Sequence, residues 1–130
     1  MKDVKKLIVG TWRLVHQMRI NSDGTTEYPY GDDAIGYIHY SDTGIMSVHI
    51  SRKSRDGTKN ISDLKHDYMA YFGRYEVDTK EHVVRHFVEG ELFPGDHNEV
   101  LVRKYRFDGD LMSLKTVDGS NLEILWQRVR

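Results

Sequence analysis

The sequence predicts an all-β protein: one domain, residues 1–130, folded as an eight-stranded up-and-down antiparallel β-barrel with one short helix covering one end. Three observations favour this fold. Polar and apolar residues alternate along short segments, as in strands with one solvated face. Single glycines beside polar residues, as in Asp23-Gly24 and Asp108-Gly109, separate these segments like hairpin turns. A tryptophan lies in the first and in the last of these segments, so we expect the ends of the sheet to meet and close it.

The length and composition of the chain exclude several kinds of partner and site. A chain of 130 residues fits one domain and needs no second one. The 19 basic and 20 acidic residues are interspersed and give a formal charge of -1, so we expect no nucleic-acid partner and no membrane partner. Without cysteine there is no disulfide framework, thiolate metal site or cysteine nucleophile. The N-terminal apolar run is too short for a signal peptide or a membrane span, and the expected location is the cytoplasm.

The expected strands cover residues 9–20, 34–41, 45–51, 72–78, 82–89, 98–107, 111–117 and 121–129. Residues 21–33 are polar and read as a loop. The one helix is predicted after the basic loop of residues 52–59, with Ser62 as its N-cap and Gly73 as its end. Its apolar stripe would be Leu64, Tyr68, Tyr71 and Phe72. A helix that interrupts a meander of strands can pack over one open end of the barrel.

Alternation gives each strand an inward face. In the sixth strand Lys104 and Arg106 must face water, which turns Arg103 and Tyr105 inward. In the first strand the same rule places Gln17 outside. The apolar inward residues are then Leu14, Met18, Ile38, Met46, Val48, Val84, Val88, Leu101, Phe107, Met112, Leu114 and Ile124. The polar inward residues are His16, Tyr40, Tyr75, His86, Arg103, Tyr105 and Thr116.

Several ordered blocks of the sequence resemble one known family. They are Gly10-Thr11-Trp12-Arg13-Leu14, Gly36-Tyr37-Ile38-His39-Tyr40, Gly44-Ile45-Met46-Ser47, Tyr71-Phe72-Gly73-Arg74-Tyr75-Glu76-Val77 and Trp126-Gln127-Arg128-Val129, together with His86 and Arg103. Nearly the whole chain is similar to the bacterial and fungal lipocalin-like domains of the calycin superfamily. The resemblance implies an up-and-down barrel with a helix over one end. It also implies that Trp12 and Arg128 correspond to the pair that closes the narrow end, where the guanidinium lies over the indole ring.

Arg103 points to a function. A buried guanidinium costs several kcal/mol unless it is paired, and no inward Asp or Glu is available to it. Either tyrosine hydroxyls, backbone carbonyls and trapped water satisfy it, or it receives an oxygen of a bound small molecule. The second alternative predicts a protein that binds a small, largely apolar molecule carrying a carbonyl or carboxylate in the barrel interior. The ligand-binding residues would be His16, Tyr40, Met46, Tyr75, His86, Arg103, Tyr105 and Trp126.

Two other functions fit the same pattern. The cavity could belong to a cofactor-independent isomerase, cyclase or lyase, with His86 as the base and Arg103 or Tyr75 holding the oxyanion. Whether the protein is an enzyme stays open at this point. Alternatively, the barrel could be packed solid, with its role on the surface.

No metal or cofactor is expected. His82 and His86 share a strand face but would lie about 13 Å apart, too far for one ion. Haem held by one interior histidine is the remaining alternative, and no phosphate-binding or dinucleotide motif is present. Outward-facing apolar residues would suit a homodimer, namely Val15, Val100, Val102 and Leu125.

Overall fold

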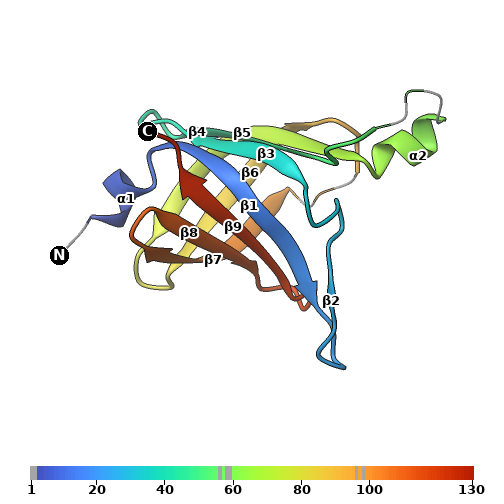
Figure 1. The fold of residues 1–130 in the computed structure, drawn as a ribbon. Coiled ribbons are helices and arrows are strands. Elements are labelled where there is room, and N and C mark those ends of the chain that lie inside the picture. The colour runs from blue at the N-terminus through green and yellow to red at the C-terminus, as the bar shows by residue number, and fades with distance from the viewer. Residues whose placement is uncertain (1–2, 56, 58–59, 96, 98) are drawn as a thin grey trace.

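A computed structural model describes residues 3–55, 57, 60–95, 97 and 99–130. The described chain forms a closed antiparallel barrel with one additional short strand (Figure 1). Its elements are α1 (Val4–Leu7), β1 (Gly10–Ile20), β2 (Thr26–Glu27), β3 (Ile35–Tyr40), β4 (Ile45–Ser51), α2 (Ile61–Lys65), β5 (Tyr68–Asp78), β6 (Val83–Glu91), β7 (Val100–Asp108), β8 (Leu111–Thr116) and β9 (Leu122–Arg128). The strands follow one another around the barrel in chain order, and β1 also pairs with β9. The predicted up-and-down barrel is confirmed.

The alternation of side chains builds the interior as predicted for most strands. On β3 and β4 the side chains of Ile38, Met46, Val48 and Ile50 are buried, and their neighbours in sequence face outward. On β7, Leu101 and Tyr105 are buried while Lys104 and Arg106 are exposed, so Arg103 lies on the inward face. These strands form a continuous apolar core across the barrel.

One strand departs from simple alternation. The register between β1 and β9 shifts between Leu14 and His16, which is a β-bulge. A bulge inserts one residue and so exchanges the two faces of the strand beyond it. Gln17 therefore turns inward and is 6% exposed, whereas Ile20 is 46% exposed. His16 leaves the interior: its Nε2 lies 2.9 Å from Oε1 of Glu123. Met18 pairs with Glu123 on the same outer face, so the predicted inward positions of His16 and Met18 were wrong.

The helices also differ from the prediction. α2 ends at Lys65 and stands beside the start of β5, outside the barrel in Figure 1. The rest of the predicted stripe belongs to strand β5, where Tyr71 is buried and the adjacent Phe72 is 55% exposed, a period of two. The helix that packs at a barrel end is α1, since Val4 contacts the core and Ile8 directly after α1 is fully buried. Neither described helix has the length and apolar character that crossing a membrane requires.

Beside α1, a tryptophan and an arginine join the two ends of the chain. The Cζ atom of Arg128 lies 4.2 Å from the ring centroid of Trp12. The same guanidinium donates hydrogen bonds to the carbonyl oxygen of Val9, at 3.1 Å, and to that of Leu7. Gly10 has a φ of +141°, and a Cβ atom there would lie 3.0 Å from Nη1 of Arg128. The glycine therefore allows the arginine to reach the first strand.

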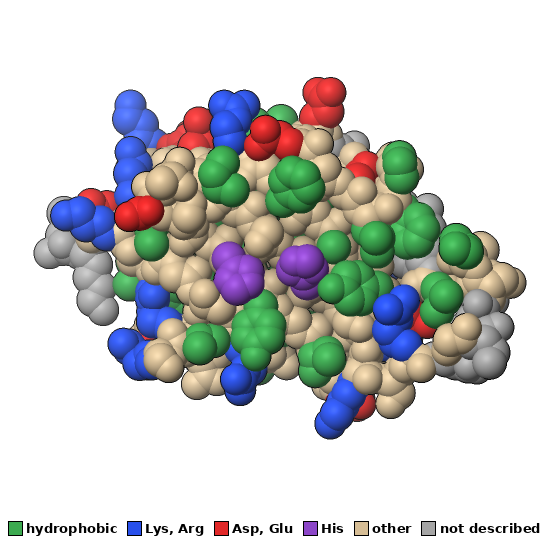
Figure 2. Space-filling view, turned by 90° about the horizontal axis from the view of Figure 1, so that it is seen from above, with side chains coloured by type: hydrophobic (Ala, Val, Ile, Leu, Met, Phe, Trp, Pro, Cys, Tyr) green, Lys and Arg blue, Asp and Glu red, His purple; other side chains and the backbone are tan. Residues whose placement is uncertain are grey.

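The outer face of β3, β4 and the start of β5 carries an apolar patch. Ile35, Tyr37, Ile45 and Phe72 are exposed there, and Figure 2 shows hydrophobic side chains around two histidines on this face. The residues first expected at a dimer interface lie elsewhere, and Val15 and Val100 are both exposed. Homodimer formation stays a prediction.

Candidate functional site

The barrel encloses a cavity of about 150 Å³. Most of its wall is aliphatic or aromatic, contributed by Tyr30, Ile38, Val48, Ile50, Met69, Leu114, Leu122 and Ile124. Its polar lining residues are Gln17, Tyr71, His86, His97, Arg103 and Trp126. An apolar cavity with a few polar groups on its wall is the usual form of a small-molecule site.

The size of this cavity limits what it can hold. Pockets for drug-sized ligands begin at about 300 Å³, whereas an apolar cavity of about 150 Å³ accepts a benzene ring. The interior of this barrel therefore suits a single ring with short substituents. A larger hollow of about 570 Å³ lies outside the barrel, where charged residues of α1 face the turn between β3 and β4.

His86 on β6 is fully enclosed between two tyrosines. Its Nε2 lies 2.6 Å from the hydroxyl of Tyr40, and its Nδ1 lies 2.7 Å from the hydroxyl of Tyr71. Burial, with a smaller contribution from the positive charge of Arg103, lowers the pKa of His86 to about 3. The imidazole is therefore neutral at pH 7, with one nitrogen donating and the other accepting.

The two tautomers of His86 leave different hydroxyl hydrogens free. With the proton on Nδ1, His86 donates to Tyr71, Tyr40 donates to Nε2, and the Tyr71 hydroxyl can donate into the cavity. With the proton on Nε2, the hydroxyl hydrogen of the buried Tyr40 would need another acceptor, and the described residues offer it none. Because an unsatisfied buried donor is costly, the structure favours the first tautomer. Tyr71 then presents a hydrogen-bond donor to the cavity.

Arg103 on β7 contributes a positive charge to the same part of the wall. Its positive charge lowers the pKa of His86, in the same direction as burial does. On Tyr71 the charge opposes burial, which raises the pKa of the hydroxyl to about 12. Its one described hydrogen bond runs from Nη1 to the carbonyl oxygen of Val102, at 3.2 Å. Asp118 feels this charge weakly, but its pKa is lowered mainly by hydrogen bonds from Ser120. In the described part of the chain no carboxylate forms an ion pair with Arg103.

Two further polar groups on the wall are buried without a partner. They are Oε1 of Gln17, an acceptor, and Nε1 of Trp126, which can only donate. Trp126 is 1% exposed, so neither bulk solvent nor a described side chain satisfies its N–H group. Both residues line the cavity.

Two loops complete the wall. His97, between β6 and β7, donates through Nδ1 to Glu91 Oε2 at 2.8 Å, and its ring packs 4.9 Å from that of Tyr71. This hydrogen bond is the largest cause of the lowered pKa of Glu91. Tyr30 belongs to the connection after β2.

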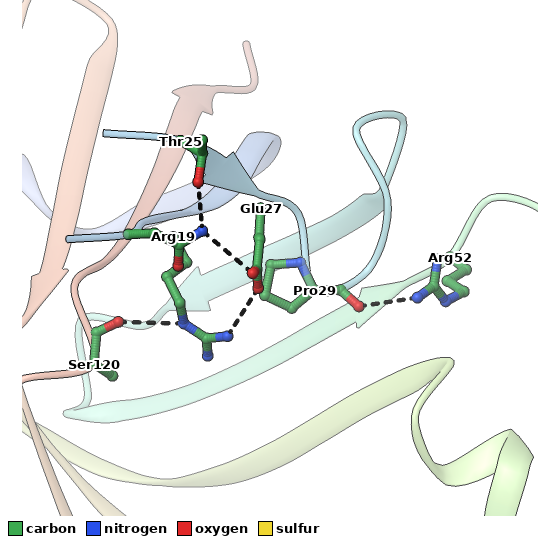
Figure 3. A network of polar contacts seen from close by, with 7 residues as sticks. Arg19, Thr25, Glu27, Pro29, Arg52 and Ser120 are labelled. Atoms are coloured by element: carbon green, nitrogen blue, oxygen red, sulfur yellow. Dashed lines mark hydrogen bonds and ion pairs between the residues drawn. The ribbon is translucent and has the colours of Figure 1, made fainter. Parts of the chain in front are cut away.

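Polar contacts fix the connection between β2 and β3 to the barrel (Figure 3). Arg19 contacts Glu27 at 3.5 Å and donates to the carbonyl oxygen of Ser120 at 3.3 Å. Arg52 donates to the carbonyl oxygen of Pro29 at 3.2 Å. These contacts tie both sides of the connection to the barrel and position the segment that carries Tyr30.

The structure brings together part of the predicted site. His86, Arg103 and Trp126 line the cavity, and Tyr40 reaches it through His86. His16 does not, because the bulge turns it outward. Met46 is buried in the core away from the lining.

Two predicted tyrosines also lie away from the cavity. The hydroxyl of Tyr75 donates to the carbonyl oxygen of Ser41 at 2.5 Å, toward the α1 end of the barrel. Tyr105 packs against Phe107, with ring centroids 5.6 Å apart. Inward orientation put both residues in the barrel, but at heights that the cavity does not reach.

Three of the polar lining residues escaped prediction. Gln17 was hidden by the bulge, and Tyr71 was assigned to the helix. The alternation of Tyr71, Gly73 and Tyr75 with charged or exposed neighbours was the signal that could have placed Tyr71 on a strand. No sequence signal marks His97, because it lies in a loop whose path alternation does not describe.

Comparison with known proteins and protein families identifies the family of this barrel. No curated protein matches the chain. A family model described as lipocalin-like domain matches residues 9–127, which span the barrel from β1 into β9. The chain therefore belongs to the family of lipocalin-like domains.

Proposed function

We propose that this barrel binds a small, largely apolar molecule that carries a carbonyl or carboxylate, with that oxygen placed next to Arg103. The observation that carries the proposal is the positive charge of Arg103 on an apolar cavity wall, without a carboxylate partner among the described residues. An anionic oxygen would accept charge-assisted hydrogen bonds from the guanidinium. The Tyr71 hydroxyl, oriented by His86, supplies a second donor nearby.

The other functions that the sequence allowed have less support. A base with a pKa of about 3, engaged at both nitrogens, is a poor proton acceptor at neutral pH. The catalytic alternative also used Tyr75 as a possible donor to the oxyanion, but Tyr75 lies outside the cavity. Haem does not fit a cavity of about 150 Å³, and His86 has no free nitrogen for iron. The same cavity argues against a solid barrel.

Binding can be tested with two probes of matched size, benzoate and benzene. We expect benzoate to bind the wild-type protein and to bind Arg103→Gln at least about tenfold more weakly, since the variant loses a charge-assisted pair. Benzene should bind both proteins equally, because the apolar walls remain. Isothermal titration calorimetry measures both affinities.

Arg106→Gln is the matched control, because Arg106 lies on the same strand but faces water. It should leave both affinities unchanged. Equal benzoate affinity in the wild type and in Arg103→Gln would contradict the proposal. Native mass spectrometry of freshly purified protein would show a retained natural ligand directly.

A further inference from the structure

A second polar end of the ligand can be inferred from two other polar residues on the cavity wall. Gln17 Oε1 and Trp126 Nε1 are the buried polar atoms on the lining that have no described partner. Leaving an acceptor and a donor unsatisfied inside a barrel costs free energy, so something that enters the cavity should bond to them.

The two residues occupy neighbouring positions on the inner wall of the barrel. Gln17 pairs with Ile124 across β1 and β9, and Trp126 follows Ile124 by two residues on the same inward face. Gln17 and Trp126 are therefore diagonal neighbours, a spacing that long and aromatic side chains span. A hydroxyl can accept from the indole N–H and donate to the amide oxygen at once. A carboxylate cannot donate, and an ammonium cannot accept.

The barrel places Gln17 on the far side of the cavity from β6, whereas Trp126 on β9 lies two strands from Arg103 on β7. Going around the eight barrel strands from β1, β6 is reached after four steps in either direction, through β3, β4 and β5 or through β9, β8 and β7. Gln17 on β1 thus faces the wall of β6, which His86 shares with its neighbours Tyr71 on β5 and Arg103 on β7. Between the two polar walls the lining is aliphatic, as at Val48 and Leu114.

We infer that the cavity is built for a single-ring hydroxy acid, with its carboxylate at Arg103 and Tyr71 and its hydroxyl between Gln17 and Trp126. The inference rests on the proposed function and adds the second polar group and its position. The volume of about 150 Å³ restricts the body between the two groups to one ring. A hydroxyl on the far side of the ring from the carboxylate matches the position of Gln17, on the strand opposite β6, better than one beside the carboxylate.

Three probes separate the contributions: 4-hydroxybenzoate, 4-methylbenzoate and 2-hydroxybenzoate. The methyl group has nearly the volume of the hydroxyl but forms no hydrogen bond. We expect the wild-type protein to bind 4-hydroxybenzoate about tenfold more tightly than 4-methylbenzoate, since two hydrogen bonds are gained. The 2-hydroxy isomer should lack this advantage, because its hydroxyl stays at the Arg103 wall.

Two variants test the receiving groups separately. Gln17→Leu and Trp126→Phe should each reduce the preference for 4-hydroxybenzoate over 4-methylbenzoate to less than about threefold. The preference is a ratio measured within each variant, so a change in the cavity that affects both ligands alike cancels. Two variants are used so that a folding defect in one of them does not remove the test.

The outcomes separate this inference from the proposed function. If benzoate binds in an Arg103-dependent way but the 4-hydroxy and 4-methyl compounds bind equally, trapped water satisfies Gln17 and Trp126, and only the hydroxy-acid inference is overturned. If none of the benzoates binds, or if Arg103→Gln has no effect on them, both proposals are overturned.

Discussion

The protein should lose stability on mild acidification because of one histidine. His86 has a pKa of about 3 in the folded protein, against about 6.5 in an unfolded chain. Below about pH 6.5 the unfolded chain binds a proton that the folded protein does not, so the free energy of unfolding falls as the pH decreases toward 3. The slope is at most about 1.4 kcal/mol per pH unit. Integrated between pH 7.5 and pH 5, the loss is about 2 kcal/mol, a large share of the stability of a domain of this size.

Urea unfolding followed by tryptophan fluorescence at several pH values between 5 and 7.5 measures this loss. The comparison protein is His86→Gln, which keeps a hydrogen-bonding side chain between Tyr40 and Tyr71 but does not titrate. The wild type should lose about 2 kcal/mol more than this variant over the same interval. His49→Gln removes an exposed histidine of the outer face and serves as the control. Parallel pH dependences for the wild type and His86→Gln would show that His86 takes up its proton in the folded state.

Three substitutions test how the barrel is closed and packed. Arg128→Ala should destabilise the protein by about 2 to 4 kcal/mol in urea unfolding, since it removes a cation over an aromatic ring and hydrogen bonds from a charged donor. Arg130→Ala, which breaks an exposed ion pair, should cost less than about 1 kcal/mol, and equal losses would count against a special role for Arg128. Gly73→Ala would put a Cβ atom 1.8 Å from a carbonyl oxygen of β6 and should cost about 3 kcal/mol or more, while Gly57→Ala meets nothing within 4 Å; thermal melts that do not differ would refute this. Leu114→Ala enlarges the cavity and should destabilise the protein by about 2 to 5 kcal/mol in urea unfolding. The variant should also bind neutral aromatic molecules larger than benzene. Unchanged stability would mean that the barrel collapses onto the gap.

The alternation of polar and apolar residues was sufficient to predict the inward face of the regular strands. The inward side of β7 followed from Lys104 and Arg106 alone, because two charged side chains on one strand face can only point to water. This placed Arg103 inside without any structural information. The meeting of the first and last strands likewise followed from the two terminal tryptophan segments, and the β1 to β9 pairing confirms it.

Local irregularities were the limit of prediction. A bulge depends on how two strands fit around a curved sheet, so the single-strand pattern from Trp12 to Ile20 contains no trace of it, and Gln17 and His16 exchanged places. The helix was overextended because Leu64, Tyr68 and Tyr71 fit a helical stripe, while the pairing of β5 with β4 and β6 decides their conformation. The alternation pattern also does not tell how far along the barrel axis a residue lies. Tyr75 and Tyr105 were therefore placed in the site because they face inward, although the cavity does not reach them.

The seam between β1 and β9 has a consequence for biosynthesis. The strand that completes the barrel is synthesised after all the other barrel strands, so the nascent chain carries β1 with one side unpaired until β9 has emerged. The hydrogen bond between His16 and Glu123 and the stacking of Arg128 on Trp12 both cross this seam, and both form only after synthesis has passed β9. Residues separated by more than a hundred positions must find each other to close the seam, and contacts between residues so distant in sequence form slowly.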